Sequence, residues 1–394
     1  MLSKIKVIEL ASVLAGPSVG QFFAELGAEV IKIENLKTQG DVTRSWKGSG
    51  EKTDERSAYF CSVNWGKRSL AINLTKKEGR EIIHKLVAEA DIVIASYKPG
   101  DAEKLEMDYG ILSKLNPKLI YGQITGYGSD NPRVGYDAII QAEAGFMYMN
   151  GEQGGASLKM PVALIDVLAG HHLKEGVLLA MLQRQQTGKG SFVEVSLIQA
   201  AISSLINQAT NWLIAGKLPQ KKGSAHPNIA PYGDVFTTKD GQEVLLAVGS
   251  DRQFTDLCEL FKISEMASEP KFSTNHSRVD NRKELNLILQ EKISCLIADT
   301  IIDDLNKAKI PAGRIQNLEQ VFKMNEATEL LIQSDDRTGV KSYVGSIGFS
   351  VNQGNTSHIS PPPKLGEHTS EILLSSLQLS PESIKNLFEK GIIL

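Results

Sequence analysis

One acidic residue, Asp166, interrupts the apolar run PVALIDVLAG. A carboxylate among aliphatic side chains is expensive to bury as an anion unless neighbouring groups stabilise it. The commoner explanation is structural: a helix begins at or just after Asp166, and an Asp at the N-cap accepts N–H bonds from the first turn. The same geometry suits chemistry, because these donors would keep the carboxylate ionised, and such a carboxylate can attack an activated acyl group. The residues alone leave both interpretations open.

Other polar residues give weaker signals. His171 and His172 follow Asp166 on the same expected helix. They come five and six positions later, whereas side chains that meet on a helix are three or four positions apart. A catalytic Asp–His pair is therefore not expected. The sequence also lacks a serine nucleophile elbow and an H-E-x-x-H metal motif.

The loop SYKPGDAEKL carries Lys98 and Lys104 just after an expected strand. Open α/β sheets bind ligands at the carboxyl ends of their strands, so these lysines are candidates for phosphate contacts. They could equally be ordinary solvated side chains. Further along, Tyr136 and Asp137 precede an expected helix. A helix cap would be a sufficient explanation for Asp137.

Alternating strands and helices must position these residues. The expected strands cover 4–10, 28–34, 69–74, 91–96, 118–125 and 191–197, and helices are expected over 16–28, 75–90 and 159–186. This alternation predicts an α/β fold with a mostly parallel sheet. The turn ASVLAGPSVG after the first strand has no G-x-G-x-x-G pattern. A Rossmann-like topology without NAD is therefore expected.

Composition and turn signals suggest how the chain is divided. The segment KLPQKKGSAHPNIAPYG is rich in Lys, Gly and Pro, which is typical of a linker. Beyond it we expect a hairpin around KDGQ, helical segments over 251–307, a strand pair near TGVKSYVGSIGFS and a tail with two short helices. The predicted large domain comprises 1–200 and 321–394, and its second part begins with a return linker. Between these parts we expect a linker over 201–224 and a small domain over 225–320.

The overall composition excludes several classes of protein. The chain has 394 residues and a formal net charge of −3, whereas a general nucleic-acid binder normally has a basic excess. It shows no secretory signal pattern and no apolar run long enough for a transmembrane helix. The 3 scattered cysteines fit neither a disulfide framework nor a zinc site. We therefore expect a cytoplasmic protein with no nucleic-acid or membrane partner.

Taken together, the motifs resemble those of the class III CoA-transferases, the group that includes formyl-CoA transferase, carnitine CoA-transferase and 2-methylacyl-CoA racemase. The resemblance covers essentially the whole chain. It rests on VIELASVLAGPSVGQFFAELGAEVIKIE, NWGKRSLAINL, ADIVIASYKPG, LNPKLIYGQITGYG, GYDAIIQAEAG, DVLAG with TGKG, HPNIAPYGDVF and PPPKLGEHTSEIL, in the family's order. It implies a Rossmann-like large domain formed by both termini, a smaller α+β domain and an interlocked homodimer.

The resemblance also implies a reaction. Asp166 would attack an acyl-CoA thioester to give a mixed anhydride, and the CoA thiolate would then form an aspartyl-CoA thioester and release a free carboxylic acid. An acceptor acid would reverse these steps. The partners would be an acyl-CoA and a free carboxylic acid, with coenzyme A thioesters as substrates and no bound metal or redox cofactor.

Carried over residue by residue, the family pattern implies a CoA site. It comprises Leu14, Ala15, Ile72, Asn73, Leu74, Ser96, Tyr97, Lys98, Lys104, Arg133 and Tyr136, with Asp137 as a substrate-binding residue. Some positions depart from the family. Leu14 replaces a Gln of formyl-CoA transferase, and VGSDRQF replaces its glycine-rich loop, so a formyl–oxalyl substrate pair is not expected. SYKPG stands where Asn-Phe-Arg-Pro-Gly is common, so Lys98 keeps the charge but loses the bidentate fork of Arg.

Two alternatives differ from CoA transfer. A racemase needs an acid and a base on opposite faces of its substrate, and family racemases carry a His where this chain has Tyr136. A phenol with a reference pKa of about 10 is a poor base near neutrality, which favours the transferase. The other alternative is a non-catalytic CoA-binding protein, and the retained Asp166 argues against it.

Overall fold

The computed structural model describes residues 1–333, 342–350 and 359–394. Its contacts divide the chain into two units. The sheet unit comprises Met1–Ala144, Met160–Thr210 and Thr328–Leu394, so it holds both termini. The small unit comprises Gly145–Lys159 and Asn211–Ala327.

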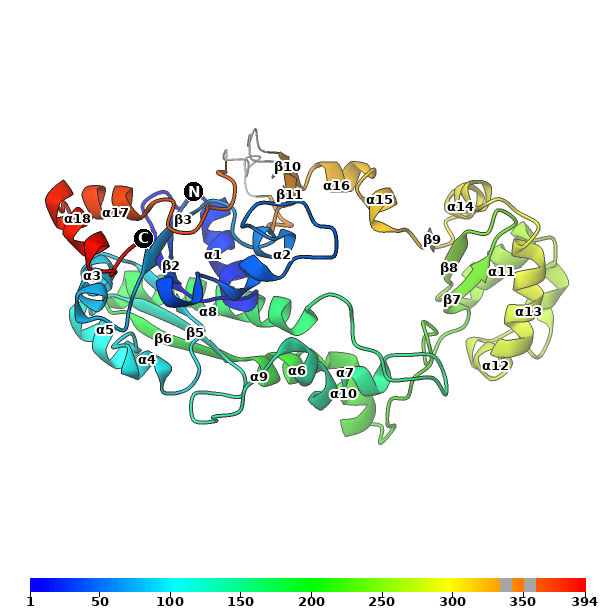
Figure 1. Cartoon of the computed structure of the whole chain (residues 1–394). Coiled ribbons are helices and arrows are strands. Elements are labelled where there is room, and N and C mark those ends of the chain that lie inside the picture. Colours follow the sequence, from blue (N-terminus) through cyan, green and yellow to red (C-terminus); the bar gives the residue numbers. More distant parts are fainter. Residues whose placement is uncertain (334–341, 351–358) are drawn as a thin grey trace. The chain divides into compact units, whose positions relative to one another are not determined.

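A parallel sheet of six strands forms the centre of the sheet unit (Figure 1). Its order is β3-β2-β1-β4-β5-β6, and every neighbouring pair is parallel. This is the strand order of a Rossmann fold, so the predicted α/β class with a parallel sheet is confirmed. The strands are β1 (Lys6–Leu10), β2 (Glu29–Asn35), β3 (Lys67–Ile72), β4 (Ile92–Ala95), β5 (Ile120–Thr125) and β6 (Ser191–Ser196).

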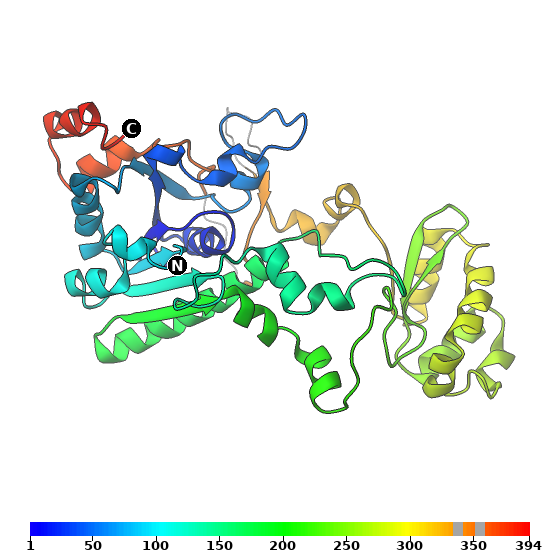
Figure 2. The same cartoon turned by 60° about the horizontal axis from the view of Figure 1, so that its bottom comes forward.

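Helices cover both faces of this sheet, which explains why the central strands are nearly continuous apolar runs. On one face, Ile8 and Val93 pack with residues of α3 (Lys77–Ala88), α5 (Tyr109–Leu115), α17 (Thr369–Ser375) and α18 (Pro381–Glu389). On the other face lie α1 (Ala15–Glu25) and α8 (Leu164–Thr187), which contact each other and the sheet. Figures 1 and 2 show the C-terminal helices beside α3, on the side of the sheet away from α8.

The C-terminal segment is joined to strand β3. The N–H of Asn73 donates to the carbonyl of Ile392 at 2.8 Å, and Ile72 forms a bridge with Ile393. The N–H of His368 also donates to the carbonyl of Ser69 at 3.1 Å. These bonds place the end of the chain in the same unit as its beginning. The two short helices predicted for the tail are α17 and α18.

The small unit is built on an antiparallel sheet of three strands with helices packed against it. Strands β7 (Tyr232–Thr237) and β8 (Glu243–Ala247) form the predicted hairpin, and β9 (Ala312–Arg314) pairs with β8. Phe236, Val244 and Phe254 belong to its buried core. The main helices are α11 (Asp251–Leu260), α12 (Asn275–Asp280), α13 (Arg282–Ile293) and α14 (Ala298–Lys307).

Residues 145–159 belong to the small unit although they precede most of it in the chain, and hydrogen bonds join them to the segment around Lys221. The ammonium group of Lys221 donates to the carbonyl of Gly155 at 2.7 Å, and the N–H of Gly223 donates to that of Gly151 at 2.9 Å. The strand pair expected near the C-terminus is formed by β10 (Leu331–Gln333) and β11 (Ser342–Val344), although part of the expected segment lies outside the described residues.

Short elements complete the two units. Across the parts of the chain that the structure describes, no helix combines the length and apolarity needed to cross a bilayer. The short elements are α2 (Ala58–Cys61), α4 (Asp101–Lys104), α6 (Asp137–Glu143), α7 (Phe146–Met149), α9 (Leu197–Ser203), α10 (Ile206–Leu213), α15 (Leu318–Val321), α16 (Asn325–Thr328), η1 (Leu36–Thr38), η2 (Val42–Ser45) and η3 (Ser264–Ser268).

Candidate active site

A cavity of about 270 Å³ lies at the carboxyl edge of the parallel sheet. Its walls come from the turns that follow β1, β4 and β5, and from the first turns of α6 and α8. Strand β1 is where the order of the sheet reverses, and open α/β sheets bind ligands at this switch point. We call this space the Asp166 cavity because the Asp166 carboxylate borders it.

Asp166 is the third residue of α8 and is only 9% exposed. The N-cap of α8 is Ala163, so the N-cap role expected for Asp166 is wrong. Burial and, after it, the negative charge of Asp137 raise the pKa of Asp166 to about 7. Desolvation and a like charge thus outweigh the favourable helix terminus, so the helix donors do not hold the pKa of Asp166 at its usual low value.

Asp137 performs the capping that was expected of Asp166. Its Oδ1 atom accepts a hydrogen bond from the N–H of Ile165, in the first turn of α8, at 2.7 Å. Its Oδ2 atom accepts one from Nε2 of Gln141, also at 2.7 Å. One carboxylate thus ties α6 to the beginning of α8 and places a second negative charge near Asp166.

Helices α8 and α1 pack closely together beside the site. A Cβ atom added at Gly170, one turn after Asp166, would lie 2.5 Å from Oγ of Ser18 and 3.3 Å from the carbonyl oxygen of Ala15. Only a glycine allows this approach. Because Ala15 lines the Asp166 cavity, the contact joins the helix that carries Asp166 to the opposite wall.

Most of the residues proposed for CoA and substrate border this one cavity. A second cavity of about 230 Å³ adjoins it, shares Ser12, Ser96 and Tyr97 with it, and is lined by Leu74. The proposed residues that line the Asp166 cavity are Leu14, Ala15, Ser96, Tyr97, Lys98, Arg133, Tyr136 and Asp137.

Three of the proposed CoA residues have other surroundings. Ile72 is fully buried in the core. The side chain of Asn73 accepts hydrogen bonds from the N–H and hydroxyl of Thr75 at 3.1 and 2.7 Å. Lys104 is exposed and pairs with Asp101 at 3.0 Å.

Two positive side chains lie at the rim of the Asp166 cavity. The guanidinium of Arg133 binds Glu143 and lies 4.1 Å above the ring of Tyr127. Lys98 is exposed, and within the described part of the chain its ammonium group has no ion-pair partner. Among the residues that the structure describes, no group of three or more His, Cys, Asp and Glu side chains could hold a metal ion.

Several residues of the site carried no recognisable signal in the sequence. Tyr59 lies on the short helix α2, and its pKa is raised by burial and then by the charges of Asp166, Asp137 and Asp41. Val13 also lines the Asp166 cavity. Asp41 lines the adjoining one. Tyr59 and Asp41 lie outside the quoted motifs, and nothing in the residues around Val13 singled it out, so only the folded structure brings the three positions to the site.

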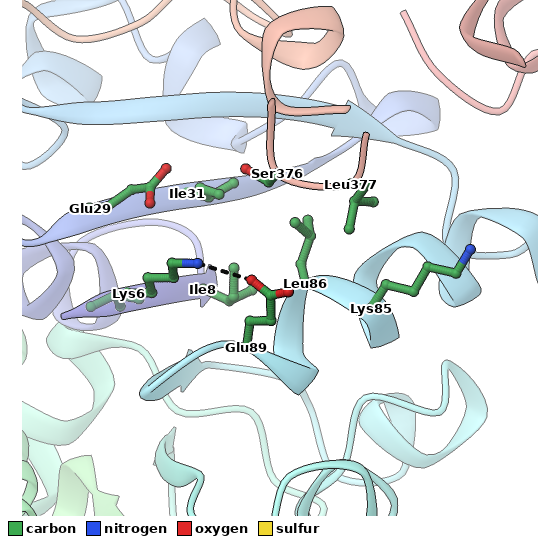
Figure 3. A pocket seen from close by; sticks show the side chains of 10 residues that line it. Lys6, Ile8, Glu29, Ile31, Lys85, Leu86, Glu89, Ser376 and Leu377 are labelled. Carbon is green, nitrogen blue, oxygen red and sulfur yellow. Dashed lines mark hydrogen bonds and ion pairs between the residues drawn. The ribbon is translucent and has the colours of Figure 1, made fainter. Parts of the chain in front are cut away.

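A further cavity occurs at the opposite, amino edge of the sheet (Figure 3). It is lined by Ile8, Ile31 and Leu86, and the Lys6–Glu89 ion pair of 3.0 Å borders it. Its volume is about 20 Å³, which is room for roughly one water molecule. A space of this size cannot hold a thioester, so the carboxyl edge is the candidate active site.

Comparisons with known proteins identify the same kind of enzyme. The model of CoA-transferase family III matches residues 2–369. A succinate–glutarate CoA-transferase of Agrobacterium fabrum is 36% identical, covering 94% of this chain and 94% of that protein. The human succinyl-CoA:glutarate CoA-transferase is 33% identical, covering 100% of this chain and 90% of that protein.

A solved structure shows the same fold. The crystal structure of a CaiB/BaiF family protein from Brucella suis aligns with a TM-score of 0.84 at 37% identity, covering 93% of this chain and 97% of that one. These matches span the sheet, the Asp166 cavity and the small unit. The chain therefore belongs to CoA-transferase family III, and it is an enzyme of this class.

Proposed function

We propose that this CoA-transferase uses Asp166 as a nucleophile to move CoA from an acyl-CoA thioester to a free carboxylic acid. The observation that carries the proposal is the setting of this one carboxylate. It borders a cavity at the switch point of the sheet, it is 9% exposed, and no described side chain donates a hydrogen bond to it. A carboxylate that is poorly solvated and unpaired retains its reactivity towards an acyl group.

The proposed chemistry exchanges one acyl bond at a time. An Asp166 oxygen attacks the thioester carbonyl, the C–S bond breaks, and the CoA thiolate leaves a mixed anhydride. The thiolate then attacks the Asp166 carbonyl, which releases the donor's carboxylate and leaves an aspartyl-CoA thioester. The acceptor carboxylate attacks this thioester to form a new mixed anhydride, and the thiolate then attacks the acceptor's acyl carbon, which regenerates Asp166. Proton transfer is not required, so the enzyme's contribution is alignment and exclusion of water.

The two adjoining cavities offer a path for CoA. We place the pantetheine along Ser96 and Tyr97, which border both cavities, and the nucleotide in the cavity lined by Leu74. Lys98 at the rim is the proposed phosphate contact, because its charge has no ion-pair partner among the described residues. Ile72, Asn73 and Lys104 remain proposals from the family resemblance and carry no support from the cavities.

The relatives suggest the class of acid. Two of them are named for succinate and glutarate, which are short dicarboxylates. We propose succinyl-CoA as a donor and a dicarboxylate of similar length as the acceptor. Arg133 and Lys98 supply positive charge near the cavity for a second carboxylate, and Asp137 would border the bound acid.

We also propose that the enzyme is an interlocked homodimer. Helix α8 exposes Leu178, Leu179 and Leu182, which are 38%, 66% and 58% accessible. Ile202 on the adjoining helix α9 is 53% accessible. Clustered apolar side chains of this size mark an interaction surface. Two segments of each chain would cross between the domains if the boundaries follow the predicted division. That division is 1–200, 201–224, 225–320 and 321–394.

The covalent step can be tested by mass spectrometry. We expect the intact protein to gain the mass of a CoA thioester after incubation with succinyl-CoA and to lose it when glutarate is added. The Asp166→Asn protein should show neither change. Asp91→Asn is a matched control, because Asp91 pairs with Arg184 at 3.0 Å outside the Asp166 cavity. Substantial turnover by Asp166→Asn would refute the assignment of the nucleophile.

A further inference from the structure

The turn that follows β1 has an unfavourable backbone conformation. Val13 has a φ of 74°, a left-handed value that is rare for a β-branched residue. Such a conformation persists only where surrounding contacts impose it. The turn matters for the site, because Val13, Leu14 and Ala15 all line the cavity that contains Asp166.

Two buried side chains hold this turn. The N–H of Val13 donates to both carboxylate oxygens of Asp41, each at 3.3 Å. Asp41 is fixed in turn by the ammonium group of Lys32 at 2.9 Å and by the hydroxyl of Thr43 at 2.8 Å. The same Lys32 ammonium donates to the carbonyl of Ala11 at 2.9 Å, so both ends of the turn are attached to one ion pair.

This ion pair belongs to a larger buried group of charges. Lys32 also binds Glu9 at 2.9 Å, and Glu9 binds Lys67 at 2.7 Å. All four charged side chains, including Asp41, are at most 1% exposed. The group extends from α1, where Lys67 donates to the carbonyl of Pro17 at 2.8 Å, to the second cavity, which Lys32 and Asp41 line.

Buried ion pairs rarely add stability over apolar residues of similar volume, because desolvation offsets their attraction. What they can supply is a fixed geometry, and here that geometry is imposed on the cavity wall. Ala15, two residues after Val13 and the first residue of α1, lies against Gly170 of α8, one turn from Asp166. The charged group is therefore connected to both sides of the reacting centre.

We propose that Asp41 and Lys32 are positioning residues that hold the Val13 turn against Asp166 and so set the geometry in which a thioester carbonyl meets the nucleophile. This inference rests on the proposed function, in which Asp166 is that nucleophile. Asp41 and Lys32 also line the adjoining cavity. An effect on the turn must therefore be separated from an effect on CoA binding.

A double-mutant cycle makes this separation. We expect Asp41→Asn to lower kcat by about 10- to 100-fold, because small misplacements of reacting groups have effects of this size. The Kd for CoA should change by less than about 3-fold, well below the loss of kcat. In a Val13→Gly background the same substitution should lower kcat much less, since glycine adopts a positive φ without strain. Equal losses of kcat in the two backgrounds would show that Asp41 does not act through Val13.

Amide hydrogen exchange gives a readout that does not depend on catalysis. Residues 11–15 should lose protection in Asp41→Asn and keep it in the Asp91→Asn control, whose ion pair with Arg184 lies outside the Asp166 cavity. If Asp41→Asn does not fold, Thr43→Val removes one hydroxyl bond to Asp41 and should produce the same changes in smaller measure. Unchanged protection in the folded variant would overturn the inference. Failure of the nucleophile assignment is detected separately, by turnover of Asp166→Asn.

Discussion

At the scale of single residues, the site depends on two carboxylates with different tasks. Asp137 accepts hydrogen bonds from Ile165 and Gln141 and holds the beginning of α8. Asp166 has no such donors among the described side chains, and burial together with the charge of Asp137 raises its pKa to about 7. The environment thus separates a carboxylate that caps a helix from the one that we propose as the nucleophile, although both are aspartates.

The raised pKa of Asp166 predicts a pH-dependent cost in stability. The unfolded chain releases this proton near pH 4, whereas the folded chain keeps it until about pH 7, so wild-type stability falls as the pH rises between these values. Asp166→Asn has no charge to desolvate. We expect its free energy of unfolding to exceed that of the wild type by an amount that grows by about 2–3 kcal/mol from pH 5 to pH 8. Urea unfolding at both pH values measures this, and a difference that does not vary with pH would contradict it.

Replacing Asp137 should change the pH dependence of the reaction. The proposed chemistry needs ionised Asp166, so kcat/KM should fall as the pH drops through about 7. Asp137→Asn removes the like charge but leaves Asp166 buried. We therefore expect the acidic fall of kcat/KM to occur at a lower pH than in the wild type, but still above the pKa of a free carboxyl group. The pH profile of kcat/KM is the measurement. The Asp91→Asn control should keep its limb near pH 7, and an unshifted limb in Asp137→Asn would show that the two charges are not coupled.

At the scale of elements, the relation between α1 and α8 decides whether the site is assembled. Both helices begin at the carboxyl edge of the sheet, so their first turns line the same cavity. Their approach depends on Gly170, where a side chain would meet Ser18 and the backbone of Ala15. Helix packing therefore sets the distance between Asp166 and the opposite wall of the cavity.

Gly170→Ala tests this packing. Alanine favours a helix by about 1 kcal/mol over glycine, but its Cβ would lie 2.5 Å from Oγ of Ser18, and overpacking of this kind costs about 1–3 kcal/mol. We expect a net loss of stability and a lower kcat, measured by thermal unfolding and transfer assays. Adding Ser18→Ala removes that oxygen and should restore part of both, while the contact of 3.3 Å with Ala15 remains. Strictly additive effects of the two substitutions would argue against a direct clash.

At the scale of the whole molecule, chain connectivity and exposed surface point to assembly. The sheet unit contains both ends of the chain, and the small unit is inserted between its parts. Apolar side chains of α8 and α9 are left exposed in the single chain. An interlocked dimer would bury such side chains and would prevent the two chains from separating without unfolding.

Subunit exchange tests interlocking directly. Sedimentation should show a dimer down to the lowest measurable concentration, because linked chains cannot dissociate by dilution. Tagged and untagged proteins, mixed in native buffer, should form no mixed dimers, whereas unfolding and refolding them together should produce such dimers. Rapid exchange under native conditions would exclude interlocking, and a monomer at all concentrations would exclude the dimer itself.

Much of the fold could be predicted from the sequence, because it depends on local patterns. Apolar runs such as those around Val7 and Ile92 predicted the strands, and their alternation with helices predicted a parallel sheet. Asp166 could be singled out because an acid is conspicuous in an apolar run. The motifs also indicated the family to which the chain belongs.

The tertiary structure decided everything that depends on distance in space. The pKa of Asp166 reflects its burial and the nearness of Asp137, and neither follows from their separation along the chain. The cap of α8 comes from another helix, and the strained turn at Val13 is held by Asp41 from a distant loop. Desolvation, charge–charge interaction and hydrogen bonding all act through space, so the sequence by itself determined which groups are present, while only the fold determined which of them meet.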